Sequence, residues 1–294
     1  MKGRVAVLGP GGVGGLLAAL LARSGYDVVC VAGDDTARVL AERGLSLRSS
    51  MFGTFSVPVA ASSLLVDPVD VCLVTVKAGD LERALDRLPA VAVGGGDVIP
   101  FLNGLDHVAV LRQRYPEARV SPATIQVEAV RVAPGVIEHT SPFARVGIGD
   151  APPVADALAS VGLTVVRHDD EVELLWDKLA RLAPLALITA YARVPIGPAR
   201  HQHAELLDGV VNEVSSVALA DGAAVDEREV RAFLAGLPDA MTSSLHRDVE
   251  AGRLGELDAI GGAVVRAARR HAVPVPVTER VVETIASSVA QRLP

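Results

Sequence analysis

The sequence predicts an α/β protein in two domains, an N-terminal one on a parallel sheet and a C-terminal one made of helices. Three observations support this division. The first 35 residues alternate between apolar strand, glycine turn, helix and second strand. After Asp169 the spacing of apolar residues is almost entirely that of helices. The chain of 294 residues is also longer than one average hydrophobic core accommodates. We place the domains at residues 1–168 and 169–294.

The first domain opens with a βαβ unit. Val5–Leu8 and Val28–Val31 are short, continuous apolar runs, which is typical of strands buried on both faces of a parallel sheet. The helix between them covers Leu16–Arg23 and ends before Gly25. The same alternation continues, so we expect strands at Val69–Val74 and Asp97–Ile99 with a helix at about Asp80–Leu88 between them.

A different pattern follows Val120. Alternating segments separated by Pro134-Gly135 and Ser141-Pro142 indicate antiparallel, hairpin-like strands at Thr124–Val132, Gly135–His139 and Ala144–Ile148. Leu163–Val166 is the expected last strand of the domain. Asp170 stands three residues before Glu173, a spacing typical of a capping box, so we expect a long helix to begin there. The last helix is expected at about Thr278–Arg292.

Composition excludes several classes of function. The net charge is −7, and no run of basic residues offers a nucleic-acid surface. Cys30 and Cys72 lie inside apolar strands, so we expect buried thiols in a reducing compartment. The stretch Leu182–Ala192 contains Pro184 and is too short to cross a membrane. We therefore expect a cytoplasmic protein without a membrane or nucleic-acid partner, and its Ala- and Leu-rich helical domain suits a homodimer.

The strongest local motif lies between the first strand and the first helix. Glycine turns of the form G-x-G-x-x-G in this position bind dinucleotides in Rossmann domains. The first glycine permits the tight turn, the second lets a pyrophosphate approach the backbone, and the third lets the helix pack closely. The helix N-terminus then faces the phosphates. The expected cofactor-binding residues of this turn are Gly9, Gly11, Gly12, Val13 and Gly14.

The residues at the end of the second strand should determine whether NAD or NADP is preferred. An acidic residue there binds the ribose hydroxyls of NAD, whereas an arginine attracts the 2′-phosphate of NADP. Asp34 occupies this zone and favours NAD. Arg38 lies one helical turn further and keeps NADP open.

Several motifs in order resemble the ketopantoate reductase family, whose members reduce 2-dehydropantoate to pantoate with NADPH. The resemblance runs from Gly9 to about Arg280. Besides the glycine turn, its markers are Leu73–Ala78, Asn103-Gly104-Leu105, Leu175–Leu179, Ser243-Ser244-Leu245, Gly255–Asp258 and His271–Pro274. The resemblance implies a step of pantothenate biosynthesis, and a helical domain similar to the C-terminal domain of 6-phosphogluconate dehydrogenase.

The resemblance also implies roles for individual residues. Lys178 would be the general acid, and Glu256 would bind the substrate and hold the lysine. Asn103 and Lys77 would lie near the nicotinamide and its ribose. Asn103 would also bind the substrate, and Ser244 would hold the substrate carboxylate. These residue types suit the chemistry, because hydride transfer to a ketone leaves negative charge on oxygen that a cationic proton donor stabilises. Lysine is suitable because partial burial lowers its pKa.

The sequence departs from the family beside the expected general acid. Family members usually carry asparagines where Leu182 and Ala186 stand, one and two helical turns after Lys178, and another where Gly261 stands. We expect Leu182 and Ala186 to form an apolar substrate wall. Gly33 replaces an arginine that the family commonly places after the second strand. The sequence thus predicts reduction of 2-dehydropantoate or of a less polar 2-oxo acid.

Two alternatives stay open. A non-catalytic dinucleotide-binding protein that senses redox state would also explain the lost asparagines, and an enzyme working in the oxidative direction would keep the same residues. Other candidates point to no further chemistry. His201 and His203 lack partners at metal-ligand spacing, so no metal site is expected. His246 beside Ser244 does not make a hydrolase triad, and Trp176 is expected to be a packing residue.

Overall fold

The computed structural model describes residues 3–291, which divide into two compact units. The first unit comprises the chain up to residue 102 together with 107–174, and the second comprises 103–106 together with the chain from 175 onward. The passage from the first to the second lies inside helix α7 (Glu171–Ala192), just beyond the expected boundary at residue 168. The transfer of residues 103–106 to the helical unit was not expected from the sequence.

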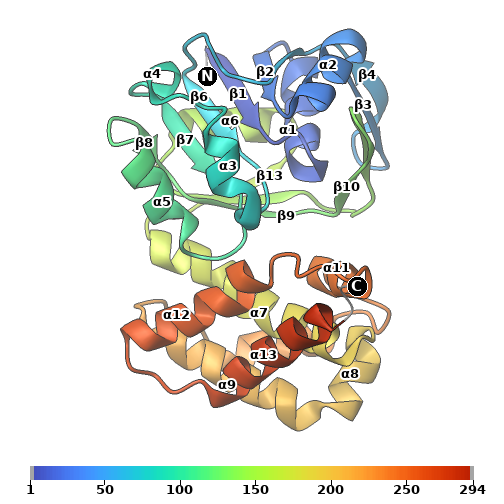
Figure 1. The fold of residues 1–294 in the computed structure, drawn as a ribbon, viewed down its shortest axis with the longest axis vertical. Helices are drawn as coiled ribbons and strands as arrows, with labels where there is room; N and C mark the ends of the chain where they lie inside the picture. Colours follow the sequence, from blue (N-terminus) through green and yellow to red (C-terminus); the bar gives the residue numbers. More distant parts are fainter. Residues whose placement is uncertain (1–2, 292–294) are drawn as a thin grey trace. The chain divides into compact units, whose positions relative to one another are not determined.

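A parallel sheet forms the centre of the first unit (Figure 1), and this confirms the predicted architecture. Its order is β5-β2-β1-β6-β7-β8. The chain continues from β1 to β2 on one side, while β6 pairs with β1 on the other side. Ligands of such sheets bind at the carboxyl ends of the strands beside this change of direction. The strands are β1 (Arg4–Leu8), β2 (Asp27–Val31), β5 (Ala60–Ser62), β6 (Val71–Val74), β7 (Asp97–Pro100) and β8 (Arg119–Val120).

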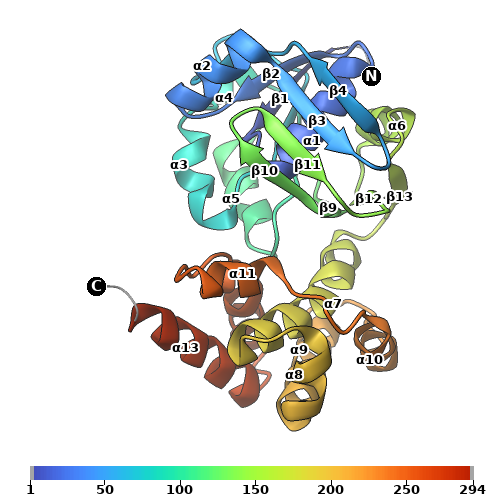
Figure 2. The same cartoon turned by 90° about the vertical axis from the view of Figure 1, so that its right-hand side faces the viewer.

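Helix α1 (Gly12–Arg23) follows β1 directly and is buried from Gly14 to Leu21. It contacts the central sheet and also a second sheet of order β10-β11-β3-β4 (Figure 2), which explains why it is apolar almost all round. A Cβ on Gly15 would lie 2.5 Å from Ile137 Cδ1, so the glycine permits this close packing. The second sheet contains β3 (Leu45–Ser49), β4 (Gly53–Val57), β10 (Ala129–Ala133) and β11 (Val136–His139).

The antiparallel expectation is confirmed in part. β10 and β11 form the predicted hairpin. The single strand predicted at Thr124–Val132 is wrong, because the chain breaks into β9 (Ala123–Gln126) and β10, which belong to different sheets. The break is fixed at Glu128, whose backbone N–H donates to Ser141 Oγ at 2.9 Å and whose carbonyl accepts from Thr140 N. β9 pairs antiparallel with β12 (Arg145–Ile148), and the last strand, β13 (Thr164–Arg167), runs parallel to β12.

Short helices complete the first unit. The helix expected at Asp80–Leu88 is shorter than predicted: a 3-10 turn at Ala78–Asp80 precedes α3 (Leu81–Leu85). Several other helices of this unit were not expected from the sequence. These are α2 (Asp34–Arg43), α4 (Ala90–Val93), α5 (His107–Arg114) and α6 (Pro152–Ser160).

The second unit is helical, as predicted. Its first helix, α7, begins at the predicted cap: Asp170 Oδ1 accepts hydrogen bonds from the backbone N–H groups of Val172 and Glu173 at 2.7 and 3.0 Å. The other helices are α8 (Ile196–Gln202), α9 (Ala204–Ala220), α10 (Glu227–Gly236), α11 (Ser244–Glu250), a π-helical turn η2 (Asp258–Gly262), α12 (Ala263–Arg270) and α13 (Pro276–Ala290). α13 is the expected last helix, and Arg292 lies outside the described residues.

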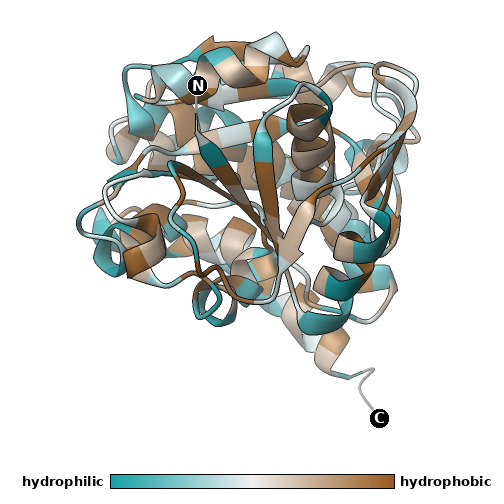
Figure 3. Cartoon of the chain, turned by 90° about the horizontal axis from the view of Figure 1, so that it is seen from above, coloured by the Kyte–Doolittle hydropathy of each residue, from teal (hydrophilic) through white to brown (hydrophobic). Residues whose placement is uncertain are grey.

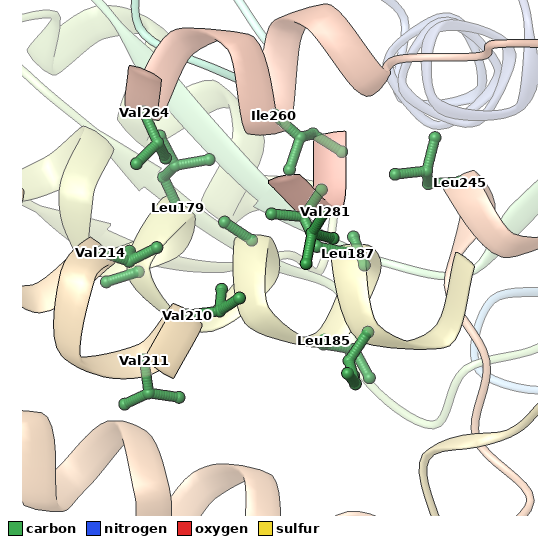
Figure 4. Close-up of a cluster of buried hydrophobic side chains, with 14 of the residues drawn as sticks. Leu179, Leu185, Leu187, Val210, Val211, Val214, Leu245, Ile260, Val264 and Val281 are labelled. Carbon is green, nitrogen blue, oxygen red and sulfur yellow. The ribbon is translucent and has the colours of Figure 1, made fainter. Parts of the chain in front are cut away.

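Aliphatic side chains from several helices form one core in this unit. Leu187, Ile260 and Val281 come from α7, η2 and α13 and gather at its centre (Figure 4). Trp176 belongs to the same core with no exposed surface, and its Nε1 donates to Asp221 Oδ2 at 2.8 Å. The prediction that this tryptophan is a packing residue is confirmed.

The distribution of apolar residues follows the elements. Strand ribbons seen from above are largely hydrophobic, whereas the outer helices carry both hydrophobic and hydrophilic residues (Figure 3).

Cys30 and Cys72 are free and buried, as expected, and burial raises the pKa of each thiol to about 12. Among residues 3–291 no single helix has both the length and the hydropathy to cross a membrane, although α7 and α8, bent by 80°, pass that test together on length and composition.

Candidate active site

The glycine turn after β1 has the geometry that its sequence predicts. Gly9 adopts a φ of +84°, in the left-handed region where a side chain is strained. A Cβ on Gly14 would lie 2.2 Å from Thr75 Oγ1 and 2.6 Å from the carbonyl oxygen of Gly9. Thr75 fixes the turn further, since its hydroxyl lies 2.9 Å from the carbonyl oxygens of both Leu8 and Gly9. The turn is therefore packed against the segment that follows β6.

Gly11 differs from the other glycines of the turn. The nearest atom that its Cβ would meet is Gly9 O at 3.8 Å, so the space over its backbone is open. Gly11 caps α1, and Gly12 and Val13 are the first residues of that helix. Helix N-termini expose backbone N–H groups and the positive end of the helix dipole. The residues present thus fit a dinucleotide pyrophosphate, which needs a close, donor-rich approach to the backbone.

Two further residues expected at the cofactor lie at the carboxyl ends of neighbouring strands. Asp34 is exposed and begins α2, just after β2. Lys77 is exposed and caps the 3-10 turn that follows β6. Ligands bind at this edge of a parallel sheet, so both positions suit contacts with a bound nucleotide.

Lys178 lies on α7 and is half-buried. Burial lowers the pKa of its ammonium group from 10.5 to about 8, and the nearby Glu256 carboxylate opposes this shift. Lys178 therefore titrates close to neutral pH, which is what a proton donor and acceptor needs.

Glu256 is held in turn by Asn103. The Nδ2 of Asn103 donates to Glu256 Oε2 at 2.9 Å, and both side chains are half-buried. Asn103 belongs to the helical unit, because the turn that it starts packs against that unit. Gly104, with a φ of +90°, lies so close to η2 that a Cβ would be 2.2 Å from Ala259 O. Arg266 Nη2 also donates to Asp106 Oδ2 at 2.8 Å.

Comparison with known proteins decides the family. The model described as ketopantoate reductase PanE/ApbA matches residues 5–153, and the model of its C-terminal domain matches residues 172–288. The chain belongs to the ketopantoate reductase family. The 2-dehydropantoate 2-reductase of Caulobacter vibrioides is 32% identical over 95% of this chain and 96% of its own. That of Halobacterium salinarum is 30% identical over 98% and 99%.

Solved structures show the same fold. The crystal structure of a PanE/ApbA family ketopantoate reductase from Ralstonia eutropha JMP134 has a TM-score of 0.89 to this chain. Its sequence is 26% identical, and the likeness covers 98% of this chain and 99% of that chain. The resemblance seen in the sequence motifs is thus confirmed, and it extends over 98% of this ketopantoate reductase family member.

The two neighbouring serines of this family member differ in their exposure. Ser243 is buried and caps α11: its Oγ accepts from His246 N at 2.9 Å and lies 3.0 Å from Thr189 Oγ1. His246 is buried as well, and its Nδ1 lies 2.8 Å from Thr189 O. These contacts give the histidine a structural role. Ser244 is exposed at the start of the same helix. Of the two serines, the expected carboxylate ligand is therefore the accessible one.

The three positions where the family usually has asparagine lie at or near the apolar core of the helical unit. Ala186 is fully buried in that core, and Leu182 is partly buried against it. A Cβ on Gly261 would lie 2.5 Å from Val282 Cγ2 and 3.0 Å from Leu187 Cδ2. The volume that an asparagine would need at position 261 is thus filled by aliphatic side chains.

Sequence reasoning missed the groups that hold the expected site residues in place. Thr75 braces the glycine turn, and the Asp106–Arg266 pair secures the Asn103 turn. Arg253 Nη2 donates to Asp248 Oδ1 at 2.7 Å and anchors the loop that carries Glu256. None of these contacts has a local sequence signal, because each joins segments distant along the chain or across a loop. Within the described part of the chain, no group of His, Cys, Asp and Glu side chains is arranged to hold a metal.

Proposed function

We propose that this protein reduces a 2-oxo acid with a nicotinamide dinucleotide, and that its substrate is 2-dehydropantoate or a less polar analogue. The observation that carries the proposal is the group of Asn103, Glu256 and Lys178 in the helical unit. It combines a lysine of lowered pKa with a carboxylate fixed by an amide. Membership in the family and the names of the relatives support the same reaction.

The chain's own residues account for the proton transfer. The bound reduced nicotinamide supplies the hydride that the carbonyl carbon accepts. As the carbonyl double bond opens, the ammonium group of Lys178 stabilises the charge on oxygen and donates a proton to it. With a pKa of about 8, Lys178 is mostly protonated at neutral pH, yet gives up its proton readily. The Glu256 carboxylate raises the pKa of the lysine against the effect of burial, and Asn103 holds this carboxylate by donating a hydrogen bond to it.

We infer the substrate class from Ser244 and Leu182. Ser244 is accessible and has a hydroxyl for the substrate carboxylate. Leu182 offers an aliphatic surface one helical turn after Lys178, at a position where the family usually has an amide. A site without amide donors loses its discrimination in favour of a hydroxylated side chain. We therefore propose that an apolar 2-oxo acid is accepted at least as well as 2-dehydropantoate.

An assay of the purified protein tests the function. Oxidation of NADH and NADPH would be followed with 2-dehydropantoate and with trimethylpyruvate, which lacks its hydroxyl group. We expect turnover with both acids. Turnover with neither acid, by a protein that still binds the dinucleotide, would contradict the proposal. A clear preference for 2-dehydropantoate would contradict only the shift toward apolar substrates.

Three finer expectations stay predictions. Asp34 taken alone favours NADH over NADPH. Cytoplasmic location and homodimerisation were expected from cysteine usage and from the composition of the helical domain, and size-exclusion chromatography with light scattering tests the dimer.

A further inference from the structure

The residues that distinguish NADH from NADPH should lie around the end of β2. In dinucleotide-binding domains the adenosine ribose lies against this strand end, and the side chain there meets either a hydroxyl or the 2′-phosphate. In this protein Ala32 follows β2, Gly33 caps α2 and Asp34 begins that helix. The strand end itself thus supplies one carboxylate and no cation.

Arg38, the cation that the sequence offers nearby, is engaged elsewhere. Its Nη1 lies 3.4 Å from Glu42 Oε1, one turn further along α2. Both side chains are more than half exposed, at 63% and 53%. An exposed pair of this kind on a helix surface is weakly coupled to the fold and does not place a guanidinium group at the strand end.

Arg87 supplies a cation to the strand end from a different part of the chain. It follows α3, yet its Nη1 donates to Ala32 O at 3.3 Å and to Ser63 O at 2.9 Å. The same nitrogen lies 4.0 Å from Asp34 Oδ1. The backbone of Arg87 is also fixed, because its carbonyl accepts from Leu65 N at 2.9 Å. The guanidinium group is therefore positioned between the ends of β2 and β5.

The two opposite charges at this place differ in how firmly they are held. The Asp34 side chain is 85% exposed, so water screens its charge and the carboxylate is free to rotate away from a phosphate. The Arg87 side chain is only 35% exposed and is anchored by two carbonyl groups. A guanidinium group stays charged at all working pH values and has five donors in a planar fork that matches a phosphate. Nη1 of Arg87 makes both contacts with the carbonyl groups, so the N–H groups of Nη2 and Nε are left for a ligand.

We propose that Arg87 holds the 2′-phosphate of NADPH, so that this protein prefers NADPH although Gly33 and Asp34 stand at the end of β2. Asp34 accepts hydrogen bonds from the ribose hydroxyls of NADH, which binds more weakly. This inference rests on the proposed function only in requiring that a nicotinamide dinucleotide binds at the glycine turn.

Binding measurements test the inference without relying on turnover. Dissociation constants of NADP⁺ and NAD⁺ would be measured by calorimetry for the unchanged protein, for Arg87→Gln and for the matched control Arg38→Gln. We expect Arg87→Gln to weaken NADP⁺ binding by about tenfold or more, as the loss of one charged hydrogen bond implies. NAD⁺ binding should stay within about twofold, and it shows at the same time that the variant is folded. Arg38→Gln should change neither constant.

Each other outcome has a definite meaning. Equal weakening of NADP⁺ and NAD⁺ by Arg87→Gln would assign Arg87 a structural role and overturn the inference. An unchanged NADP⁺ constant would overturn it as well, and so would a tenfold loss in Arg38→Gln. If the unchanged protein bound neither dinucleotide, the proposed function would fail together with the inference. Binding of both with no effect of Arg87 would remove the inference alone.

Discussion

The amide of Asn103 donates a 2.9 Å hydrogen bond to the carboxylate of Glu256, which lies 153 positions later in the chain. Glu256 in turn acts on Lys178, whose pKa it raises against the effect of burial. The resemblance already linked Glu256 to Lys178, and the structure adds Asn103 to this pair within one compact unit.

Replacing Asn103 tests the connection. Asn103→Ala removes a donor from a half-buried carboxylate, and hydrogen bonds to charged groups contribute about 1.5–3 kcal/mol. We expect kcat/KM for the 2-oxo acid to fall by about 10- to 100-fold, while thermal unfolding changes little. Asn103→Asp should lose more, because it places a second carboxylate beside Glu256. Equal activity of the Ala and Asp variants would argue against the proposed role of the hydrogen bond.

The lowered pKa of Lys178 predicts the pH dependence of the reaction. Reduction needs the ammonium form, whose fraction falls as pH rises through about 8. We expect kcat/KM for reduction to decline above that pH and the rate of the reverse oxidation to rise. Lys178→Ala should reduce turnover by roughly 10²- to 10⁴-fold and keep dinucleotide binding. Arg181→Gln, one turn along the same helix, serves as the control and should retain the profile of the unchanged protein.

The same pKa makes a prediction about stability. In the unfolded chain Lys178 has its ordinary pKa of 10.5, whereas in the folded protein the value is about 8. Between these values the unfolded state binds more protons, so the free energy of unfolding rises with pH in this window. Below about pH 8 the cost of the buried charge is fully present. Denaturant unfolding of the unchanged protein and of Lys178→Met should therefore differ in slope against pH between about 8 and 10.5, and parallel curves would contradict the assigned shift.

Substitutions at two glycines of the turn should have different effects, one on stability and the other on cofactor binding. The Cβ of Gly14→Ala would lie 2.6 Å from Gly9 O, a backbone atom that cannot move aside easily. We expect this variant to lose about 1–3 kcal/mol of unfolding free energy, as overpacked substitutions do. Gly11→Ala meets only Gly9 O at 3.8 Å, so it should unfold like the unchanged protein and bind the dinucleotide more weakly. Similar thermal stabilities of the two variants would contradict this assignment.

Introducing asparagine at position 182 and at position 261 should have different effects. Leu182 is only partly buried, so Leu182→Asn is expected to fold and to raise the ratio of kcat/KM for 2-dehydropantoate over trimethylpyruvate by about tenfold. Gly261→Asn brings a side chain onto Val282 and Leu187 and should instead lower the melting temperature. An unchanged substrate ratio in Leu182→Asn would show that Leu182 does not contact the substrate side chain.

Local patterns predicted the parts of the fold that depend on neighbouring residues. Continuous apolar runs located β1, β2, β6 and β7, and Asp170 marked the start of α7. The break at Glu128 was missed because it depends on Ser141, a partner from another strand segment. Helix α2 and the strands β3, β4, β5 and β8 were missed as well, since their apolar faces are short and are completed only by packing.

By itself the sequence determined the class of fold, the dinucleotide turn and the family, because strand periodicity, glycine spacing and ordered motifs are local properties of the chain. Only the tertiary structure decided that Asn103 belongs with Glu256, that Gly261 has no room for an amide, and that Arg87 reaches the end of β2. The reason is physical: hydrogen bonds, steric contacts and burial act between atoms that are close in space, and these atoms come from segments far apart along the chain.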